Sequence, residues 1–209
     1  MKVILFQGDS ITDSVRGTGL GHGYALLTTA QLGYEYPNEY TFYNRGVCGN
    51  RIVDLYARIK QDMINLKPDY LSILIGVNDV WQELDSQNGV DAEKFEHIYC
   101  MLIQELKAAL PQVKIMILEP FCLEASATKN TEAFPDKWNV FHTEVAKRAQ
   151  KAKNVAQKYG LKFVPLQEKF DAAAKSAPND YWLYDGVHPT AKGHELIKRE
   201  WIKAFEEIK

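Results

Sequence analysis

The sequence of 209 residues has little cysteine, no apolar run long enough to cross a bilayer and almost no net charge. Its three cysteines, Cys48, Cys100 and Cys122, are widely spaced, so neither a disulfide framework nor a zinc or redox pair is indicated. The formal net charge is -2, without a long block of either sign. Nucleic acids and anionic membranes attract basic patches, so neither is expected as a partner.

Secretion signals, repeats, linkers and low-complexity tracts are also lacking. The apolar residues 3–6 are too few for the core of a signal peptide, and they run directly into a Gly-Asp-Ser turn. Together with the unpaired cysteines, this predicts a cytoplasmic protein. The length suits one hydrophobic core, so we expect a single domain over residues 1–209.

Short apolar segments alternate with amphipathic segments along the chain. Strands are predicted where the composition is β-branched, aromatic or continuously apolar, at residues 3–6, 40–44, 70–75, 113–118 and 161–164. Helices are predicted between them, at residues 24–32, 52–67, 92–110, 140–159, 168–175 and 190–208. The alternation predicts an α/β fold, a three-layer α/β/α sandwich around a parallel sheet of about five strands. The irregular segment 121–139 has the length of a lid or binding loop.

Residues that suit acyl transfer follow directly after the predicted strands. Gly8 permits a sharp turn after the first strand and leaves the hydroxyl of Ser10 exposed, which makes Ser10 a candidate nucleophile. The alternative is that Asp9 and Ser10 only cap a turn or helix. Gly46 and Asn78 follow the second and third strands. Because ligands bind at the carboxyl ends of parallel strands, these residues should gather at one edge of the sheet.

His188 has the setting of a general base. It lies in a turn three residues after Asp185, a spacing that allows the carboxylate to hold one ring nitrogen and leave the other for Ser10. The backbone N–H groups of Ser10 and Gly46 and the amide of Asn78 would form an oxyanion hole. Each residue taken singly also has a structural explanation, as a turn former, a turn glycine or a residue before proline. Three other histidines fall within predicted helices and are expected to be structural or at the surface: His97, His142 and His194.

Four sequence blocks together indicate a family. They are Gly8-Asp9-Ser10, Gly46, Gly76-Val77-Asn78-Asp79 and Asp185-Gly186-Val187-His188, in this order from the first strand to the last helix. They resemble the motif blocks of the GDSL or SGNH hydrolases, with isoleucine in place of the leucine of the name motif. The resemblance implies the flavodoxin-like SGNH hydrolase fold, with Ser10 as nucleophile, His188 as general base and Asp185 orienting it. It also implies Gly46 and Asn78 as oxyanion donors beside Ser10. This chemistry needs no cofactor or metal, and no metal-ligand spacing occurs.

Longer stretches resemble the intracellular bacterial acetylxylan esterases of this family: residues 8–13, 44–50, 67–81 and 185–189. The resemblance implies a serine esterase that removes acetyl groups from a small carbohydrate, of the acetylxylan or acetylated xylo-oligosaccharide type, through an acetyl-enzyme intermediate. It also implies a homo-oligomer. The resemblance is weakest over residues 121–139 and after Lys192.

Aromatic residues near the motifs agree with a sugar substrate, because flat rings suit the apolar faces of sugars. The candidate substrate-binding residues are Trp81, Trp182 and Tyr184, although such aromatics also pack in cores. One alternative is a lipase or thioesterase of the same family that acts on longer acyl chains. The other is a non-catalytic, flavodoxin-like binding module. The complete set of nucleophile, base, acid and oxyanion donors favours an enzyme over the binding module.

Overall fold

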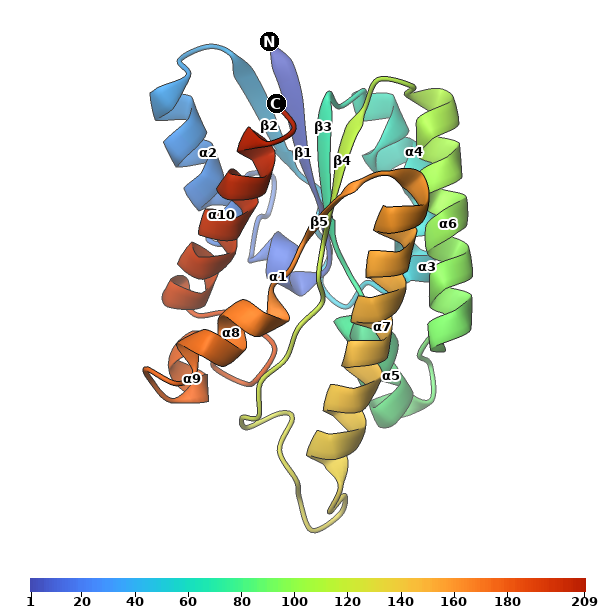
Figure 1. The fold of residues 1–209 in the computed structure, drawn as a ribbon, viewed down its shortest axis with the longest axis vertical. Helices are drawn as coiled ribbons and strands as arrows, with labels where there is room; N and C mark the ends of the chain where they lie inside the picture. Colours follow the sequence, from blue (N-terminus) through green and yellow to red (C-terminus); the bar gives the residue numbers. More distant parts are fainter.

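The computed structural model describes all 209 residues around one parallel sheet (Figure 1). Its strands are β1 (Lys2–Gly8), β2 (Tyr40–Asn44), β3 (Tyr70–Leu74), β4 (Lys114–Leu118) and β5 (Lys162–Val164). Their spatial order is β2-β1-β3-β4-β5, and every neighbouring pair is parallel. The five-stranded parallel sheet predicted from the sequence is thus confirmed.

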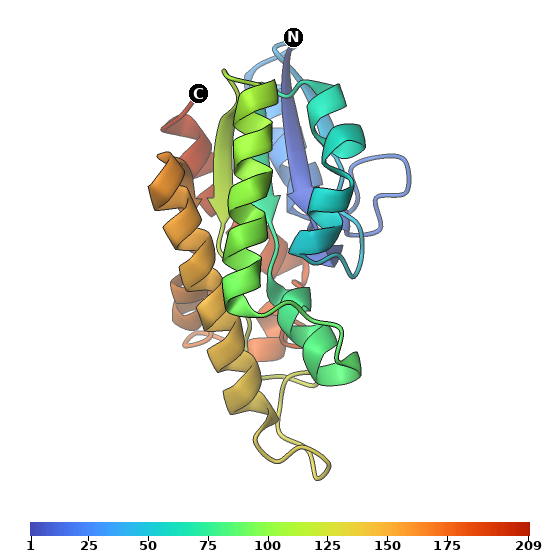
Figure 2. The ribbon, with the colours of Figure 1, turned by 90° about the vertical axis from the view of Figure 1, so that its right-hand side faces the viewer.

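Helices cover both faces of the sheet (Figures 1 and 2). The helices are α1 (Ser10–Asp13), α2 (Tyr24–Glu35), α3 (Ile52–Ala57), α4 (Ile59–Asp62), η1 (Ile64–Leu66), α5 (Val77–Ser86), α6 (Ala92–Ala109), α7 (Lys137–Tyr159), α8 (Gln167–Ala173), α9 (Asn179–Trp182) and α10 (Ala191–Glu206). Helices α2, α8 and α10 share one buried cluster with the sheet, and α3, α4, α6 and the second half of α7 share the other. The expected three-layer α/β/α arrangement is therefore present.

The central strand β3 lies between two layers of helices and is almost entirely apolar. All five of its residues are buried. Tyr70 and Leu74 belong to the cluster with α2 and α10, whereas Leu71 and Ile73 belong to the cluster with α3 and α6. Successive side chains of a strand point to opposite faces, so a strand between two helical layers has no face left for water.

The helix predicted over residues 52–67 is divided into α3, α4 and η1. The division falls at Arg58, whose φ and ψ of -109° and 15° end α3 and begin α4. The Arg58 guanidinium donates to the carbonyl of Arg45 at 2.8 Å and to Gln7 Oε1 at 2.7 Å. These bonds connect the helical segment to the ends of β1 and β2, so tertiary contacts override the helical periodicity at this residue.

Two short helices begin where turns were expected. Helix α1 starts at Ser10, directly after β1, and α5 starts at Val77, directly after Gly76. Gly76 has φ of +134°, a conformation that residues with side chains rarely adopt. The chain therefore leaves β1 and β3 straight into helices, which places the first residues of α1 and α5 at the same edge of the sheet.

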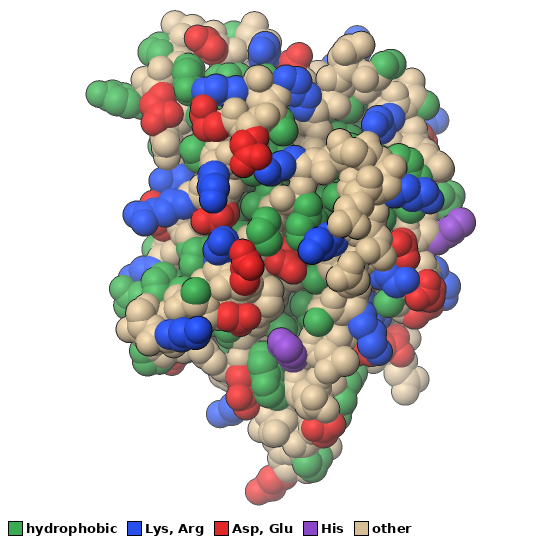
Figure 3. Space-filling view, in the orientation of Figure 1, with side chains coloured by type: hydrophobic (Ala, Val, Ile, Leu, Met, Phe, Trp, Pro, Cys, Tyr) green, Lys and Arg blue, Asp and Glu red, His purple; other side chains and the backbone are tan.

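The segment between β4 and α7, predicted to be irregular, contains no helix or strand over residues 119–136. In Figure 1 it extends beyond the carboxyl ends of the strands, at the bottom of the view. Basic and acidic side chains are intermingled on the face shown in Figure 3, without a large region of one sign. None of the helices combines the length and the apolarity needed to cross a bilayer.

Candidate active site

The candidate residues converge at the carboxyl edge of the sheet. Gly8, the last residue of β1, pairs with Leu74, the last residue of β3. Ser10 and Asn78 follow within a few residues, so parallel pairing brings the first turns of α1 and α5 together. The turn at residues 183–190 precedes α10, which packs against α2 next to β1.

Ser10, His188 and Asp185 form a continuous chain of hydrogen bonds. Ser10 Oγ lies 2.8 Å from His188 Nε2, and His188 Nδ1 lies 2.7 Å from Asp185 Oδ2. The second oxygen, Asp185 Oδ1, accepts the backbone N–H groups of Val187 and His188 at 2.9 and 2.8 Å. Both carboxylate oxygens are thus held, and the imidazole is held in turn. The arrangement can take a proton from the serine hydroxyl as the hydroxyl attacks a carbonyl.

The pKa shifts of the Asp185–His188 pair suit this chemistry. The hydrogen bond with Asp185 raises the pKa of His188 above its ordinary value, although burial opposes the change. Burial alone would raise the pKa of Asp185, but hydrogen bonds from the His188 side chain and from the backbone lower it below the ordinary range. Asp185 is therefore a carboxylate at neutral pH, and it favours the imidazolium that forms when His188 accepts a proton.

The segment after β4 holds the turn that carries Asp185. The N–H groups of Leu123 and Ala127 donate to the carbonyls of Gly186 and Asp185, at 2.8 and 2.9 Å. Gly186 has φ of +100°, and a Cβ there would lie 2.5 Å from both the Leu123 carbonyl and Thr128 Oγ1. The close approach requires glycine. Part of the expected lid or binding loop is therefore a fixed support for the Asp185–His188 turn.

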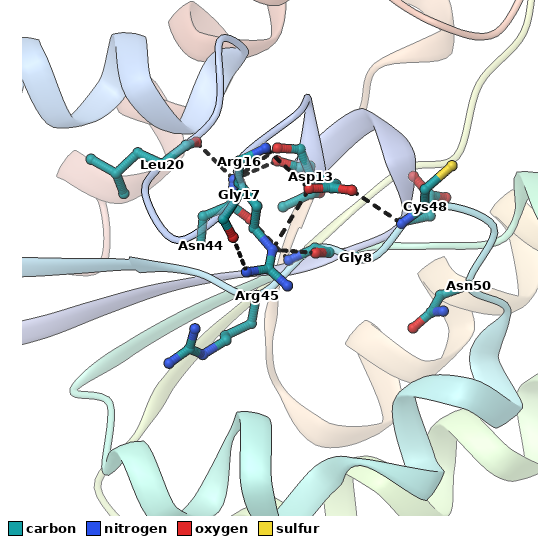
Figure 4. Close-up of polar contacts among 12 residues, drawn as sticks. Gly8, Asp13, Arg16, Gly17, Leu20, Asn44, Arg45, Cys48 and Asn50 are labelled. Carbon is teal, nitrogen blue, oxygen red and sulfur yellow. Dashed lines mark hydrogen bonds and ion pairs between the residues drawn. The ribbon is translucent and has the colours of Figure 1, made fainter.

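Gly46 does not lie as the sequence predicts for an oxyanion donor. Its N–H already donates to Asn44 Oδ1 at 2.9 Å. Gly46 is also buried against α1, where a Cβ would lie 2.3 Å from the Asp13 nitrogen, and its carbonyl accepts Arg16 Nε at 2.6 Å. Figure 4 shows Asn44, Asp13 and Arg16 gathered at this junction. The glycine permits close packing between α1 and the loop after β2, and its N–H is not available to a substrate.

Gly49 has the free donor that Gly46 lacks. Its N–H makes no hydrogen bond, its φ is +78°, and the nearest atom to a Cβ there would be Gln82 Nε2 at 3.8 Å. Its carbonyl accepts a hydrogen bond from Gln82 Nε2, and the next carbonyl, of Asn50, accepts from Asn78 Nδ2 at 3.1 Å. The sequence reading missed Gly49, because residue type alone does not say which of two nearby glycines keeps an unpaired N–H.

Helix α5 holds the Gly49 loop with three side chains from its first two turns. Asn78 and Gln82 donate to the carbonyls just described. Between them, both carboxylate oxygens of Asp79 lie within hydrogen-bonding distance of the Ile52 N–H, at 3.1 and 3.3 Å. Burial raises the pKa of Asp79 to about 7. Asn78 is itself 8% exposed and uses only one of its two amide hydrogens, so the second is free for a ligand.

Asp9 has the structural role that its position before a helix suggested. It is buried, and its Oδ1 accepts the Ile11 N–H at 3.0 Å, which caps α1. Burial raises the pKa of Asp9 to about 7. The capping bond fixes the first turn of α1 and thereby the position of Ser10. Capping and an exposed serine are compatible, since Asp9 supplies the cap and Ser10 is the first residue of the helix.

A pocket of about 490 Å³, the reaction pocket, surrounds the Ser10 hydroxyl and His188. Ile11, Cys48 and Tyr184 are among its other lining residues. The Tyr184 ring stacks on the His188 ring, with centroids 5.6 Å apart and planes at 18°. Trp81 lies on His188 as well, with centroids 5.9 Å apart. Two of the three predicted substrate-binding aromatics are thus adjacent to His188.

Trp182 does not lie with the other two aromatics. It lines a separate groove with residues of α10, among them Ala191, Leu196 and Arg199. Trp182 is the last residue of α9, and none of the residues that line its groove also lines the reaction pocket. The prediction that Trp182 contacts the substrate is therefore not supported by its place in the structure.

His194 is placed closer to Ser10 than the sequence reading expected. It lines the reaction pocket although it belongs to α10, and it is 6% exposed. Its Nδ1 accepts the Tyr24 N–H at 3.2 Å, at the start of α2. Burial lowers the pKa of His194 to about 4, so this ring is neutral at physiological pH. It connects α10 to α2 beside the pocket, which agrees with a structural role.

The comparisons of sequence found a hydrolase family and an esterase of similar sequence. A model of the GDSL-like lipase/acylhydrolase family matches residues 6–196. The acetylxylan esterase of Geobacillus stearothermophilus is 31% identical over 214 residues, which cover 96% of this chain and 92% of that protein.

Solved structures of similar fold include two relatives over nearly the whole chain. A GDSL-like lipase from Parabacteroides merdae has a TM-score of 0.90 and 36% identity, and the match covers 98% of this chain and 95% of that one. The acetylxylan esterase from G. stearothermophilus has a TM-score of 0.83 and 29% identity, with 97% and 93% covered. Structures of its catalytic mutants, in which an aspartate, a serine or a histidine is replaced by alanine, also match.

Proposed function

The chain belongs to the GDSL-like lipase/acylhydrolase family and is a carboxylic ester hydrolase, and on this premise we propose that Ser10 is its nucleophile and that it removes acetyl groups from a small carbohydrate. The observation that carries the proposal is the alignment of Ser10 Oγ, the two ring nitrogens of His188 and Asp185 Oδ2, at 2.8 and 2.7 Å. An imidazole held by a carboxylate and bonded to a serine hydroxyl is the arrangement that activates serine for acyl transfer.

The first half of the reaction forms an acetyl-enzyme. Ser10 Oγ attacks the acetyl carbonyl carbon while His188 Nε2 takes the hydroxyl proton. The carbonyl π electrons move to oxygen and give a tetrahedral oxyanion. When the intermediate collapses, the bond between the carbonyl carbon and the sugar oxygen breaks, and His188 Nε2 returns the proton to that oxygen. Asp185 favours the imidazolium between these two proton transfers.

The second half returns the free enzyme. His188 takes a proton from a water molecule, which attacks the acetyl group on Ser10. A second tetrahedral oxyanion forms and collapses, the bond to Ser10 Oγ breaks, and the serine recovers its proton from His188. Acetate leaves. The hydrogen-bond donors of the oxyanion hole stabilise both oxyanions, so the loss of one donor slows both halves of the reaction.

We propose that the oxyanion donors are the N–H groups of Ser10 and Gly49 and the free amide hydrogen of Asn78. Gly49 takes the place expected for Gly46, because the Gly46 N–H is bonded to Asn44 and the Gly49 N–H has no partner. A crystal structure of the phosphonylated enzyme tests this assignment. The phosphonyl oxygen should lie about 2.7–3.1 Å from the Gly49 nitrogen. A phosphonyl oxygen bonded to the Gly46 nitrogen instead would contradict it.

The carbohydrate part of the proposal is supported by the relatives and by the aromatic residues at the site. The sugar oxygen must come within reach of His188 Nε2 to receive its proton, and Tyr184 and Trp81 both lie against His188. Their rings can contact the apolar faces of a sugar. The relative whose name states a substrate is an acetylxylan esterase.

Rates on two substrate series test the proposed function. One series runs from p-nitrophenyl acetate to the octanoate, and the other contains acetylated xylose and acetylated xylo-oligosaccharides. Hydrolysis of the sugar acetates and a steep preference for acetyl over octanoyl are expected, with both activities lost in Ser10→Ala. A preference for longer chains would make the enzyme an acyl hydrolase of the lipase or thioesterase type. An organophosphate should label the unmodified chain but not Ser10→Ala, and a chain that takes no label would not be a serine esterase.

A further inference from the structure

A second hollow, the Tyr184 groove, adjoins the reaction pocket. It has a volume of about 390 Å³ and is lined by residues of two chain segments together with Tyr184: Glu124, Ala125, Ser126, Lys129, Asn179 and Asp180. Tyr184 also lines the reaction pocket, so one aromatic side chain forms a wall of both hollows. The groove contains neither Ser10 nor His188, and the proposed chemistry has no use for it.

Tyr184 is well placed to guide a ligand from one hollow to the other. Its ring stacks on the His188 ring, and the residue is 57% exposed, so part of the side chain remains open to a ligand. Its N–H donates to the His188 carbonyl at 3.0 Å, so its backbone is fixed next to the base. The leaving oxygen of an ester substrate must approach His188 to be protonated. Tyr184, which stacks on the His188 ring, therefore lies beside the position that this alcohol must take.

The walls of the groove are joined to each other and to the Asp185 turn. Asn179 Nδ2 donates to the Glu124 carbonyl at 2.9 Å, which links the two segments. The Ala127 N–H donates to the Asp185 carbonyl, and the Ala125 N–H donates to Thr128 Oγ1, each at 2.9 Å. These bonds hold the shape of the groove relative to His188.

The polar groups of the groove favour a neutral, hydroxyl-rich ligand. Glu124 and Asp180 offer acceptors, Lys129 offers donors, and none of the three takes part in an ion pair. Two carboxylates against one ammonium disfavour an anionic ligand. A sugar hydroxyl both donates and accepts, so neighbouring hydroxyls of a pyranose can bond to groups of either kind. A volume of this size suits a small ligand of one or two rings.

We propose that the Tyr184 groove is a second sugar subsite, which binds the unit next to the acetylated sugar in a neutral oligosaccharide. The inference rests on the proposed function, because it takes the acetylated sugar in the reaction pocket as its starting point. Tyr184 contacts both units at their junction, and Lys129 and Asp180 bind hydroxyls of the second unit. The enzyme therefore binds acetylated oligosaccharides more tightly than acetylated monosaccharides.

Two variants test the subsite. Lys129→Ala removes a donor, and Ser126→Trp fills the groove from an exposed position whose side chain makes no hydrogen bond. The matched control is Lys175→Ala, an exposed lysine outside the groove. KM for acetylated xylotriose should rise about fivefold in Lys129→Ala, the size expected for one lost hydrogen bond, and more in Ser126→Trp. KM for acetylated xylose and kcat on p-nitrophenyl acetate should stay within twofold of the parent values.

An unchanged KM for the trisaccharide in both variants would overturn the subsite, as would equal changes for the trisaccharide and the monosaccharide. Binding without catalysis separates this inference from the proposed function. Unacetylated xylotriose should perturb NMR signals of residues 124–129 and 179–180 in Ser10→Ala, and Ser126→Trp in the same background should abolish the perturbation. If the parent hydrolyses no sugar acetate but xylotriose binding remains, the proposed substrate is wrong, and the groove binds sugars without being a subsite for deacetylation. Perturbation absent from these residues overturns the subsite even if deacetylation is observed.

Discussion

The turn at residues 183–190 and the loop at residues 45–51 meet at the site but are held in opposite ways. The turn presents the side chains of Asp185 and His188, and its own backbone N–H groups fix the carboxylate. The loop presents a backbone N–H, that of Gly49, and side chains of α5 fix the loop. In the turn, backbone N–H groups hold the side chains that react. In the loop, side chains of α5 hold the backbone that carries the Gly49 N–H.

This difference determines how each region responds to substitution. A change in the turn removes a reacting group outright. The Gly49 N–H is present whatever the side chain, so a substitution can affect it only by changing the conformation of the loop, either through strain at Gly49, whose φ is +78°, or through loss of the residues that hold the loop. Effects on turnover should therefore be largest in the turn, smaller at Asn78, which both holds the loop and offers a donor, and smallest at residues that only hold it.

The largest effect is expected for His188→Ala. Loss of the base should lower kcat on p-nitrophenyl acetate by about 10⁶-fold, because members of a triad act as a unit. The double variant with Ser10→Ala should be scarcely slower than either single variant. A loss of less than tenfold in a folded variant, checked by circular dichroism, would exclude His188 as the general base.

Asn78→Ala should have an intermediate effect. The substitution removes one oxyanion donor and the bond to the Asn50 carbonyl, and we expect kcat to fall by about 10²–10³-fold with a small change in KM. Asn139→Ala, at the start of α7, is a matched control that should leave kcat unchanged. If kcat of Asn78→Ala stays within twofold of the parent, Asn78 does not contact the oxyanion.

Gln82→Ala separates holding the loop from contacting the substrate. Gln82 donates to the Gly49 carbonyl and is proposed to touch no reacting atom, so kcat should fall by about fivefold to twentyfold, with KM nearly constant. In Asn78→Ala the same change should cost less, because both side chains hold one loop and their effects are not additive. Full additivity would show that Gln82 acts independently of the oxyanion loop.

The smallest effect is expected from a change of pH on the unsubstituted enzyme. The base is active only when neutral, so kcat/KM should fall as pH decreases through the pKa of His188. The hydrogen bond with Asp185 raises this pKa, so the midpoint should lie above the ordinary histidine value of about 6.5. Asp185→Asn removes the charge, and the midpoint should move to lower pH along with a large loss of rate. A rate that stays flat down to pH of about 4 would contradict a histidine base.

The same contrast explains which parts of the site the sequence allowed us to predict. Serine, histidine and aspartate carry chemistry in their side chains, so residue type and spacing, with the resemblance of the four sequence blocks to a known family, placed Ser10, Asp185 and His188 together. Every residue except proline carries a backbone N–H, so residue type does not distinguish donors. The Gly46 N–H is bonded to Asn44 Oδ1, whereas the Gly49 N–H has no partner. Such a difference depends on contacts between elements.

The prediction of strands and helices was limited in the same way, by contacts between elements. The apolar strands were predictable because burial on both faces leaves a continuous signal, as in β3. The division of the helix at Arg58 was not, because it depends on carbonyls at the ends of other strands. Trp182 and Tyr184 were equivalent by proximity to Asp185, yet Trp182 ends α9 and lines a groove with α10, whereas Tyr184 lines the reaction pocket.

The bond between Ser10 and His188 joins residues 178 positions apart. During synthesis the nucleophile is among the first residues made, and its base is added only after all five strands have been synthesised. A partly made chain therefore carries a serine without a partner and is inert toward esters. Hydrolysis begins when the last helix docks beside the first strand, so the onset of activity in a refolding or translation experiment reports completion of the whole sheet.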